Sequence, residues 1–350
     1  MRQRVAFIEC GCNIYWQNFI IFERFLYQRT LSHGIQCRKT VQIQYTYNID
    51  INKKMNNQIM KSFLIKELNL NKDENIKITA IGGITNKNYL ILTKKMKLVL
   101  RVPGVATENF INRHNEKNNS ELVFKMGINP ETIYFDTISG IKITQYIPDS
   151  ETFSPGLVRK KNNIENISLC FRQLHQSNIK FCNEFNAFSE YKKYQHILNL
   201  KHDHDGIYHN KMLVEFFYKT EKILDRLNKD RCPCHNDLVA ENIVKSGDKI
   251  YLIDWEYSGM NDPMWDLAPH FLECQFNSEE EQIFLTYYFE RNIPKESKQK
   301  ILLFKFMQYV LWPLWAKVKE QYDDNFEKYD INRFKNAYQF MRQYQEQYEK

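Results

Sequence analysis

The sequence lacks an unbroken apolar run long enough for a membrane-spanning helix. The apolar patch at residues 14–27 is interrupted by polar and charged side chains at Gln17, Asn18, Glu23 and Arg24. The same patch has neither the clean apolar core nor the small-residue cleavage site of a signal peptide. We therefore predict no membrane insertion and a cytoplasmic location.

The cysteines lack the spacing of a disulfide framework. They include no Cys-x-x-Cys pair, and the eight of them are Cys10, Cys12, Cys37, Cys170, Cys182, Cys232, Cys234 and Cys274. Cys232 and Cys234 flank a single proline, which is too close a spacing for the usual zinc knuckle. Reduced thiols, as in most cytosolic proteins, are therefore the expectation.

Glycine and proline are also scarce, at 11 and 9 of 350 residues, while hydrophobic residues make up 43% of the chain. This composition can bury a core, and the length suits one two-lobed unit or two modest domains. The net charge of +7 is concentrated in residues 1–60, which contain eight Lys/Arg and three Asp/Glu, so that +2 remains elsewhere. No basic stripe interleaved with aromatic residues stands out in that remainder, and we predict no nucleic-acid partner.

The most informative stretch contains three polar residues at a fixed spacing. Asp237 lies two residues after His235, Asn242 follows five residues later, and Asp254 comes after a short apolar run. An Asp on a loop can orient and deprotonate a substrate hydroxyl, while an Asn five residues later can hold Mg²⁺. Residues 250–253 read as a buried strand that delivers Asp254 as a second metal ligand. A His-x-Asp triplet alone occurs by chance, but the whole set indicates a kinase-like phosphotransfer centre.

At these residues the chain resembles the choline/ethanolamine kinase family, within the aminoglycoside-phosphotransferase-like superfamily. The segments HNDLVAEN and IDWEYSGMNDPMWDLA are close to the pattern of the family's bacterial LicA-type members. The resemblance runs from about residue 76 to about residue 342. It implies an α+β, bilobal protein-kinase-like fold, with a small antiparallel β N-lobe at residues 55–148 and a larger, mainly α-helical C-lobe at residues 149–350.

Residues 1–54 match no motif that identifies a function. Met55 and Met60 are candidate internal starts, because the family-like region begins soon after them. We therefore interpret residues 1–54 either as an over-extended reading frame or as a small accessory segment of unknown role.

A glycine pair, Gly82 and Gly83, lies between two predicted strands at residues 76–81 and 89–92. Backbone amides can approach a phosphate closely at such a pair, although by itself the pattern is usually only a hairpin turn. The segment resembles the GGxTNxNY loop of the family, which implies that ATP is bound by Gly82, Gly83, Thr85 and Asn86.

Arg101 ends the next predicted strand, where protein kinases carry Lys and the resembling family carries Arg. Residues 107–125 read as a helix, and both Glu116 and Glu121 could pair with Arg101. Counted back from Pro130, Glu116 falls where the pairing Glu of the family lies. The resemblance therefore implies an ATP-binding Arg101–Glu116 pair that aligns the cation on the phosphates.

Trp312 and Trp315 are three residues apart and so share one face of a predicted helix. Aromatic residues at this spacing usually belong to the core. A quaternary ammonium, however, cannot donate a hydrogen bond and needs aromatic faces around it, with carboxylates nearby. The pair matches a WxxW pair that lines the choline pocket of family members, and Tyr257 and Glu273 match residues near that pocket. The resemblance thus implies substrate binding by these four side chains.

Four further residues are expected to support the site or the fold. Glu256 is a candidate ligand for a second Mg²⁺ or for its waters. Asp266 resembles the family's Asp that braces the catalytic loop from a helix start, where the helix dipole favours a carboxylate. His235 is expected to hold this loop through hydrogen bonds. His175 lies in a stretch of helical periodicity, and we expect it to pack between helices and to bind no ligand.

These features predict an ATP-dependent choline kinase with Mg²⁺ as its cofactor, Asp237 as its base, and ATP and choline as its partners. Ethanolamine, thiamine or an aminoglycoside as the acceptor is the main alternative, although an ammonium donor would favour more carboxylates and fewer rings. A catalytically inactive member that binds ATP or choline without turnover is a second alternative. The sequence does not indicate the oligomeric state.

Overall fold

The computed structural model describes residues 56–83, 86–105, 107–198, 210–227, 231–322 and 329–349. All of these except Asn56 belong to one compact unit, Asn57–Lys350. The predicted extension at residues 1–54 lies outside the described residues, and so does Thr85 of the predicted nucleotide loop.

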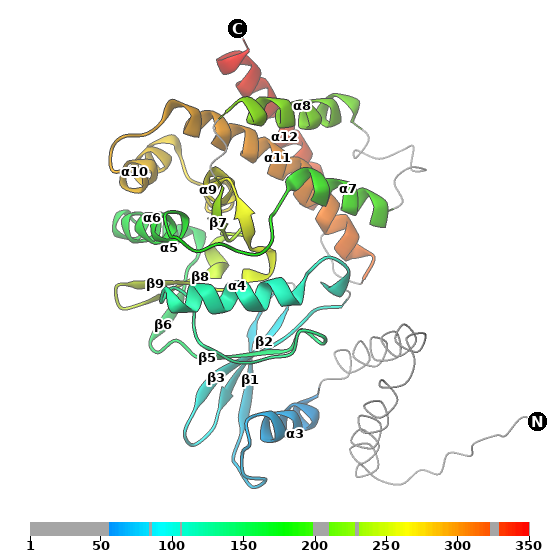
Figure 1. Cartoon of the computed structure of the whole chain (residues 1–350), viewed down its shortest axis with the longest axis vertical. Helices are drawn as coiled ribbons and strands as arrows, with labels where there is room; N and C mark the ends of the chain where they lie inside the picture. The colour runs from blue at the N-terminus through cyan, green and yellow to red at the C-terminus, as the bar shows by residue number, and fades with distance from the viewer. Residues whose placement is uncertain are drawn as a thin grey trace, which may run out of the picture. The chain divides into compact units, whose positions relative to one another are not determined.

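A five-stranded antiparallel sheet forms the N-terminal part of this unit (Figure 1). Its strands are β1 (Lys77–Gly82), β2 (Lys87–Leu92), β3 (Lys97–Val102), β4 (Thr132–Phe135) and β5 (Lys142–Gln145). The strand order is β1-β2-β3-β5-β4, so the Arg101 strand lies in the middle. The antiparallel β lobe that the sequence predicted is confirmed.

Helix α4 (Arg113–Lys125) lies between this sheet and the helical part of the unit (Figure 1). The prediction of one helix over residues 107–125 was wrong at its start. Thr107–Asn109 forms a separate 3₁₀ turn, and the Asn112 side chain accepts hydrogen bonds from the backbone N–H groups of His114 and Asn115. An Asn in this capping position starts a helix because it satisfies N–H groups that the helix itself cannot.

Helix α3 (Asn57–Glu67) precedes the sheet, and no sequence pattern predicted it. It buries Met60 and Leu64. Its Phe63 ring meets the Tyr134 ring of β4 edge-on, with the ring centroids 5.5 Å apart. The β lobe therefore has a second helix, which packs against the strand at the edge of the sheet.

Two smaller sheets carry the loops of the expected site. One contains β6 (Ser150–Thr152), β8 (Ile243–Ser246) and β9 (Lys249–Leu252). The other pairs β7 (Cys232–Cys234) with β10 (Gly259–Asn261). Asp237 lies on the loop between β7 and β8, and Asp254 follows β9, as the sequence indicated.

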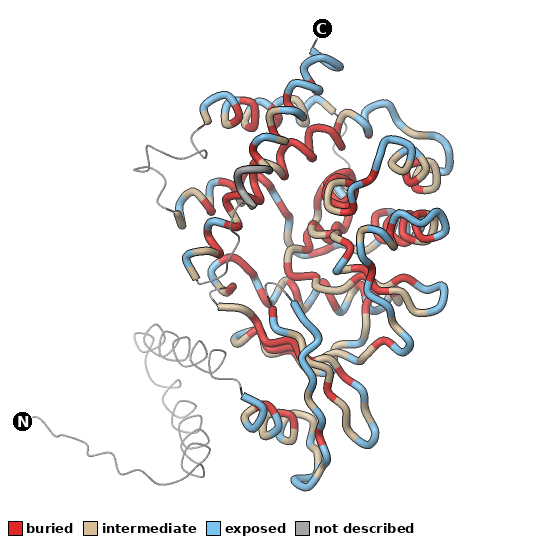
Figure 2. The backbone as a smooth tube through the Cα atoms, turned by 180° about the vertical axis from the view of Figure 1, so that it is seen from behind, coloured by how far each residue is buried: buried red, intermediate tan, exposed pale blue. Residues whose placement is uncertain are grey.

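The rest of the described chain is helical. Its helices are α5 (Pro155–Val158), α6 (Lys161–His175), α7 (Ala187–Ile197), α8 (Lys211–Arg226), α9 (Pro263–Glu273), α10 (Ser278–Tyr288), α11 (Lys295–Glu320) and α12 (Tyr329–Tyr348). Helix α11 is buried along most of its length (Figure 2). The core that the helices share includes the fully buried rings of Trp255, Trp265, Phe171 and Phe306. The mainly helical C-terminal part is thus confirmed.

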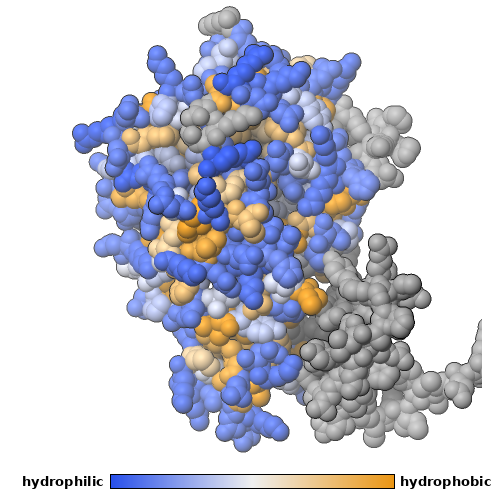
Figure 3. All heavy atoms as spheres, viewed as in Figure 1, coloured by the Kyte–Doolittle hydropathy of each residue, from blue (hydrophilic) through white to orange (hydrophobic). Residues whose placement is uncertain are grey.

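The face shown in Figure 3 is mostly hydrophilic, with hydrophobic residues in small separate groups. Among the described residues, no helix is both long enough and apolar enough to cross a membrane.

Candidate active site

One carboxylate fixes the backbone of the loop that carries His235, Asn236 and Asp237. Asp266, in the first turn of α9, accepts hydrogen bonds from the backbone N–H groups of His235 at 2.8 Å and Asn236 at 2.6 Å. Asn236 has a left-handed backbone with φ 68°. A non-glycine residue keeps this conformation only where its surroundings enforce it. The brace that was expected from Asp266 is present.

The side chain of His235 ties the same loop to the end of β9. Its Nε2 lies 2.8 Å from the carbonyl oxygen of Ile253, so this nitrogen carries the proton and donates it. Burial lowers the pKa of His235, which favours the neutral imidazole. The ring also packs against Trp255, with centroids 4.7 Å apart. His235 therefore holds the loop, as expected, and no contact gives it a part in the chemistry.

Asp237 and Asn242 are joined directly. Asn242 Nδ2 donates to the Asp237 carboxylate at 3.1 Å and to the Asp237 carbonyl oxygen at 2.9 Å. Because the amide NH₂ is used in this way, the amide oxygen is the end of Asn242 that can bind a cation. The Asn242 carbonyl also accepts from the N–H of Ile253 at 2.9 Å, which places Asn242 beside Asp254.

The surroundings of Asp237 raise its pKa, which is the direction expected for a general base. Burial, together with the negative charges of Asp254, Glu256 and Glu273, raises its pKa to about 7, against the hydrogen bond from Asn242. A carboxylate with a pKa near neutrality can take a proton from a hydroxyl more readily than an ordinary Asp.

Asp254 begins the turn after β9 in a left-handed conformation, with φ 65°. Its carboxylate accepts from Arg101 at 3.1 Å and from the side-chain amide of Asn86 at 3.3 Å. Strained backbone of this kind persists only where the surrounding packing enforces it, and it is concentrated at functional sites. The conformation therefore agrees with a role that fixes the direction of the carboxylate.

Arg101 and Glu116 form the bidentate pair that was expected, at 2.5 and 3.0 Å. Both side chains are buried. Burial alone would raise the pKa of Glu116, but Arg101, Lys142 and Arg113 together hold it well below its usual value. Glu116 is therefore charged at neutral pH, and its pair with Arg101 links α4 to β3.

Two cations of this network were not predicted from the sequence. Arg113 Nη1 lies 2.7 Å from Glu116 and 2.8 Å from Glu256, and Lys142 Nζ lies 3.4 Å from Glu116. Both side chains are buried. The i, i+3 spacing of Arg113 and Glu116 was a usable signal for their pairing. Nothing in the sequence indicated that Glu256, 143 residues away, would join them.

The predicted nucleotide loop begins at the end of β1, and its glycines are required by its shape. Gly82 and Gly83 have φ of 102° and 116°. A Cβ on Gly83 would lie 1.9 Å from the backbone oxygen of Asn86, so any side chain there would force the loop open. Asn86 is buried and donates to Glu256 at 3.1 Å as well as to Asp254. The predicted nucleotide loop thus lies against the predicted metal ligands.

Three aromatic rings that were assigned to the substrate pocket lie together. The Trp312 ring is 6.1 Å from that of Trp315 and 6.1 Å from that of Tyr257, centroid to centroid, with interplanar angles of 80° and 75°. Trp315 Nε1 donates to the Tyr257 hydroxyl at 2.8 Å, and Trp312 Nε1 donates to Gln308 at 2.6 Å. Glu273 is held by Arg333 at 2.7 Å.

A hydrogen bond connects the aromatic cluster to the loop that carries Asp237. Asn236 Nδ2 donates to the backbone carbonyl of Tyr257 at 2.9 Å. Asn236 Oδ1 in turn accepts from Asn261 Nδ2 at 2.9 Å. The residue before Asp237 therefore sets the position of the residue that carries one of the three rings.

The oxygen donors here suit Mg²⁺. Asp254, Glu256 and the Asn242 amide supply hard oxygen ligands, and the donor set contains no sulfur or imidazole. The negative charges of Asp254, Glu256 and Glu273 all act on the carboxyl group of Asp237. A divalent cation would relieve that repulsion, so the residues fit the ion that was predicted.

The sequence model of the choline/ethanolamine kinase family matches residues 78–311. Protein LicA of Haemophilus influenzae is 32% identical over 284 residues, which are 76% of this chain and 80% of that protein.

Two solved structures are also similar. The choline kinase LicA of Streptococcus pneumoniae has a TM-score of 0.73 and 34% identity, over 82% of this chain and 98% of its own. A structure of LicA in complex with AMP has a TM-score of 0.71 and 35% identity, with the same coverage. By its sequence and its fold, the chain belongs to the choline/ethanolamine kinase family.

Proposed function

We propose that this kinase transfers the γ-phosphoryl group of ATP to the hydroxyl group of choline, with Asp237 as the base. The observation that carries the proposal is the hydrogen bond between Asn236 and the Tyr257 carbonyl, because it fixes an aromatic cluster beside the loop that holds Asp237. A cation held by ring faces would then have its hydroxyl directed toward the base.

In the proposed reaction the choline hydroxyl gives its proton to Asp237 and its oxygen bonds to the γ-phosphorus. The bond from that phosphorus to the bridging oxygen breaks, and ADP leaves. A pKa of about 7 lets the carboxylate accept the proton near neutral pH. Catalysis of this kind comes mainly from positioning and charge neutralisation.

Asn242 and Asp254 would hold Mg²⁺, with Glu256 as a ligand of a second ion or of its waters. When bound there, Mg²⁺ supplies charge neutralisation between the β- and γ-phosphates. Asn86 donates to both Asp254 and Glu256, and Arg101 lies 3.1 Å from Asp254 and 4.0 Å from Glu256, which supports a coupling of the proposed nucleotide loop to the proposed metal ligands.

Arg101 is the proposed phosphate cation, and Glu116 keeps it extended from β3. Arg101 Nη1 also reaches Asp254 at 3.1 Å, which brings the guanidinium to the predicted metal site. Gly82, Gly83 and Asn86 would cover the phosphates, together with Thr85. The AMP complex of the similar LicA structure supports an adenine nucleotide as the ligand.

Tyr257, Trp312 and Trp315 are the proposed cage for the trimethylammonium group. Ring faces attract a quaternary cation that no hydrogen-bond acceptor could hold. The indole N–H groups of both tryptophans already donate within the protein, so the rings are fixed before a ligand arrives. Glu273 would add negative charge near the pocket. The choline kinase LicA of Streptococcus pneumoniae supports this choice of acceptor.

The proposal is tested by measuring ADP release from Mg·ATP with choline, ethanolamine, thiamine or kanamycin as the acceptor. We expect turnover with choline, and its loss in Asp237→Ala. Turnover with another acceptor alone would keep the phosphotransfer centre and overturn the cage. Binding of ATP and choline without turnover in the wild-type protein would indicate an inactive member of the family.

A further inference from the structure

A second group of possible ligands lies outside the site described above, on strand β7. Residues two apart on a strand point to the same face, so Cys232 and Cys234 present their thiols together. Their Sγ atoms are 3.6 Å apart. Two thiolates that share one tetrahedral Zn²⁺, each at about 2.3 Å, lie about 3.8 Å from each other. The pair is therefore spaced for one ion.

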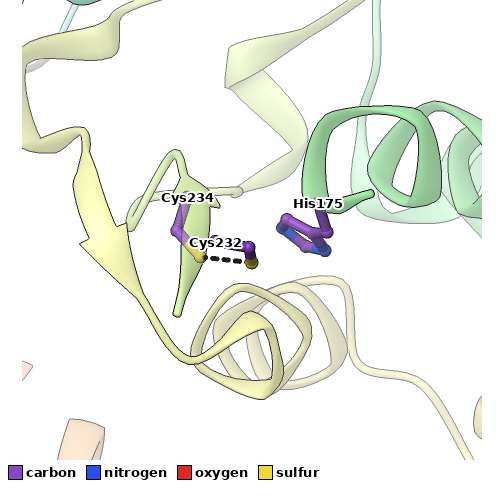
Figure 4. Close-up of side chains that lie close together, drawn as sticks. All are labelled: His175, Cys232 and Cys234. Atoms are coloured by element: carbon purple, nitrogen blue, oxygen red, sulfur yellow. Dashed lines mark hydrogen bonds between the residues drawn. The ribbon is translucent and has the colours of Figure 1, made fainter. Parts of the chain in front are cut away.

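His175, the last residue of α6, adds a nitrogen to this pair. A ring nitrogen of His175 and the two sulfur atoms all lie within 4.8 Å of one another. Figure 4 shows the imidazole facing the two thiols from the end of its helix. His175 is buried between helices, as expected, and the fold also places it beside cysteines 57 and 59 positions later in the sequence.

The imidazole is oriented from two sides. Nε2 lies 2.9 Å from the Asp266 carboxylate, and Nδ1 lies 2.8 Å from the Tyr288 hydroxyl. Histidines that bind metals usually keep the second ring nitrogen in a hydrogen bond of this kind, which fixes the ring and its tautomer. An ion bound at Nδ1 would replace the contact with Tyr288 and leave the contact between Nε2 and Asp266 in place.

We propose that Cys232, Cys234 and His175 form a structural Zn²⁺ site. Zn²⁺ binds thiolate sulfur and imidazole nitrogen, so two sulfurs and one imidazole suit it better than they suit Mg²⁺. Binding releases the protons of the two thiols to solvent and forms two Zn–S bonds and one Zn–N bond. A water or the Tyr288 oxygen would complete the tetrahedron.

The location of the cluster gives the site a mechanical role. Cys234 directly precedes His235, the first residue of the catalytic loop. Asp266, which accepts from His175, also accepts from the backbone N–H groups of His235 and Asn236. An ion at the cluster would therefore join α6 to the strand and to the carboxylate that shape this loop. The inference does not depend on which acceptor the kinase uses.

The first test is the metal content of the full-length protein, produced with added zinc and purified under reducing conditions without chelators. We expect about one zinc per chain in the wild type and in Cys182→Ser, whose thiol is exposed and donates to Asn115, outside the cluster. Cys232→Ser should lose this zinc. Cys232 is 9% exposed and a hydroxyl nearly replaces its thiol in volume, so this variant is the one expected to fold.

The second test adds Co²⁺ to chelator-treated, reduced protein in the absence of Mg²⁺ and nucleotide. We expect a thiolate-to-cobalt absorption band in the wild type and in Cys182→Ser, and none in Cys232→Ser. The chelator should also lower the melting temperature of the wild type and leave that of Cys232→Ser unchanged.

Three results would overturn the proposal. One is the absence of both zinc and the cobalt band in wild-type protein whose thiols titrate as reduced. Cys232 and Cys234 would then be only a hydrogen-bonded pair of thiols. Another is equal zinc in the wild type and Cys232→Ser. The third is stoichiometric copper in place of zinc.

Discussion

On the side of the five-stranded sheet, the proposed active site is a network of charges, whereas on the side of α11 it is built from aromatic rings. The network contains three cations, Arg101, Arg113 and Lys142, and three anions, Glu116, Asp254 and Glu256. The ring cluster contains Tyr257, Trp312 and Trp315. The difference matches the two proposed substrates: phosphates and metal need formal charge, whereas a quaternary ammonium is best held by ring faces.

This contrast has a physical consequence for substitutions. Removal of one member of the charge network leaves another buried charge without its partner, which is costly for both folding and binding. Removal of one ring takes away contact area and a share of the cation–π attraction, and leaves no unpaired charge. Substitutions on the sheet side should therefore affect stability and ATP together, and those on the α11 side should affect choline selectively.

The largest effect is expected at the point where the two sides meet. Asp237→Asn keeps the side-chain volume but cannot accept the proton, so kcat should fall by about 10²- to 10⁴-fold. KM for choline and KM for ATP should change little, because neither side of the site is altered. Steady-state kinetics would measure this, with the exposed Asp248→Asn as the matched control. A fall of less than tenfold would remove Asp237 from the role of base.

The next effect concerns the charged side. Arg101→Met leaves Glu116 and Asp254 without their shared cation, and should destabilise the protein by about 3 kcal/mol and raise KM for ATP. Arg101→Lys keeps the charge but not the bidentate geometry. Its stability and its KM for ATP should therefore lie between those of the wild type and those of Arg101→Met. Urea unfolding and ATP-dependent rates would be measured on the same samples. An unchanged KM for ATP in a folded Arg101→Met protein would contradict the proposed clamp.

A smaller and more selective effect is expected from the aromatic side. Trp315→Leu should raise KM for choline by roughly five- to thirtyfold, since one ring contributes about 1–2 kcal/mol to binding of a desolvated cation. KM for ATP should stay as in the wild type. Trp315→Phe keeps a ring but loses the hydrogen bond to the Tyr257 hydroxyl, so its effect should be milder. Equal losses in the two variants would assign the effect to that hydrogen bond.

A further prediction on the charged side concerns acid stability. The folded-state pKa of Glu116 is lowered by its three cations, so its contribution to stability is complete above the pKa of the unfolded chain. That contribution is lost as the pH falls from about 4.5 toward the lower folded-state pKa. Glu116→Gln should lose stability at pH 7 and show a flatter decline in acid. Parallel declines of the two proteins, measured by urea midpoints, would mean that other carboxyl groups dominate.

Much of this architecture was predictable from contiguous segments. Strands β1, β2 and β9 lie within two residues of the predicted bounds, and Asp237, Asn242 and Asp254 are close together because the loop and the strand that carry them are consecutive. The Arg101–Glu116 pair was found only because the family resemblance placed Glu116 opposite the strand. Local pattern and one recognised motif were sufficient for these features.

The features that were missed depend on contacts between distant segments. Arg113 and Lys142 resemble ordinary surface cations in the sequence, and only the fold buries them against Glu116 and Glu256. The start of α4 was missed because the cap at Asn112 was not recognised. The His175 cluster joins a helix end to a strand, a proximity that no local pattern encodes.

The most direct test of the two-sided site is the ratio of kcat/KM for choline to that for ethanolamine, measured in the wild type, Trp315→Leu and Trp315→Phe. We predict that the wild type prefers choline and that the preference falls in Trp315→Leu and is largely kept in Trp315→Phe. A wild-type preference for ethanolamine, or a ratio that is the same in all three proteins, would contradict recognition of the acceptor by ring faces.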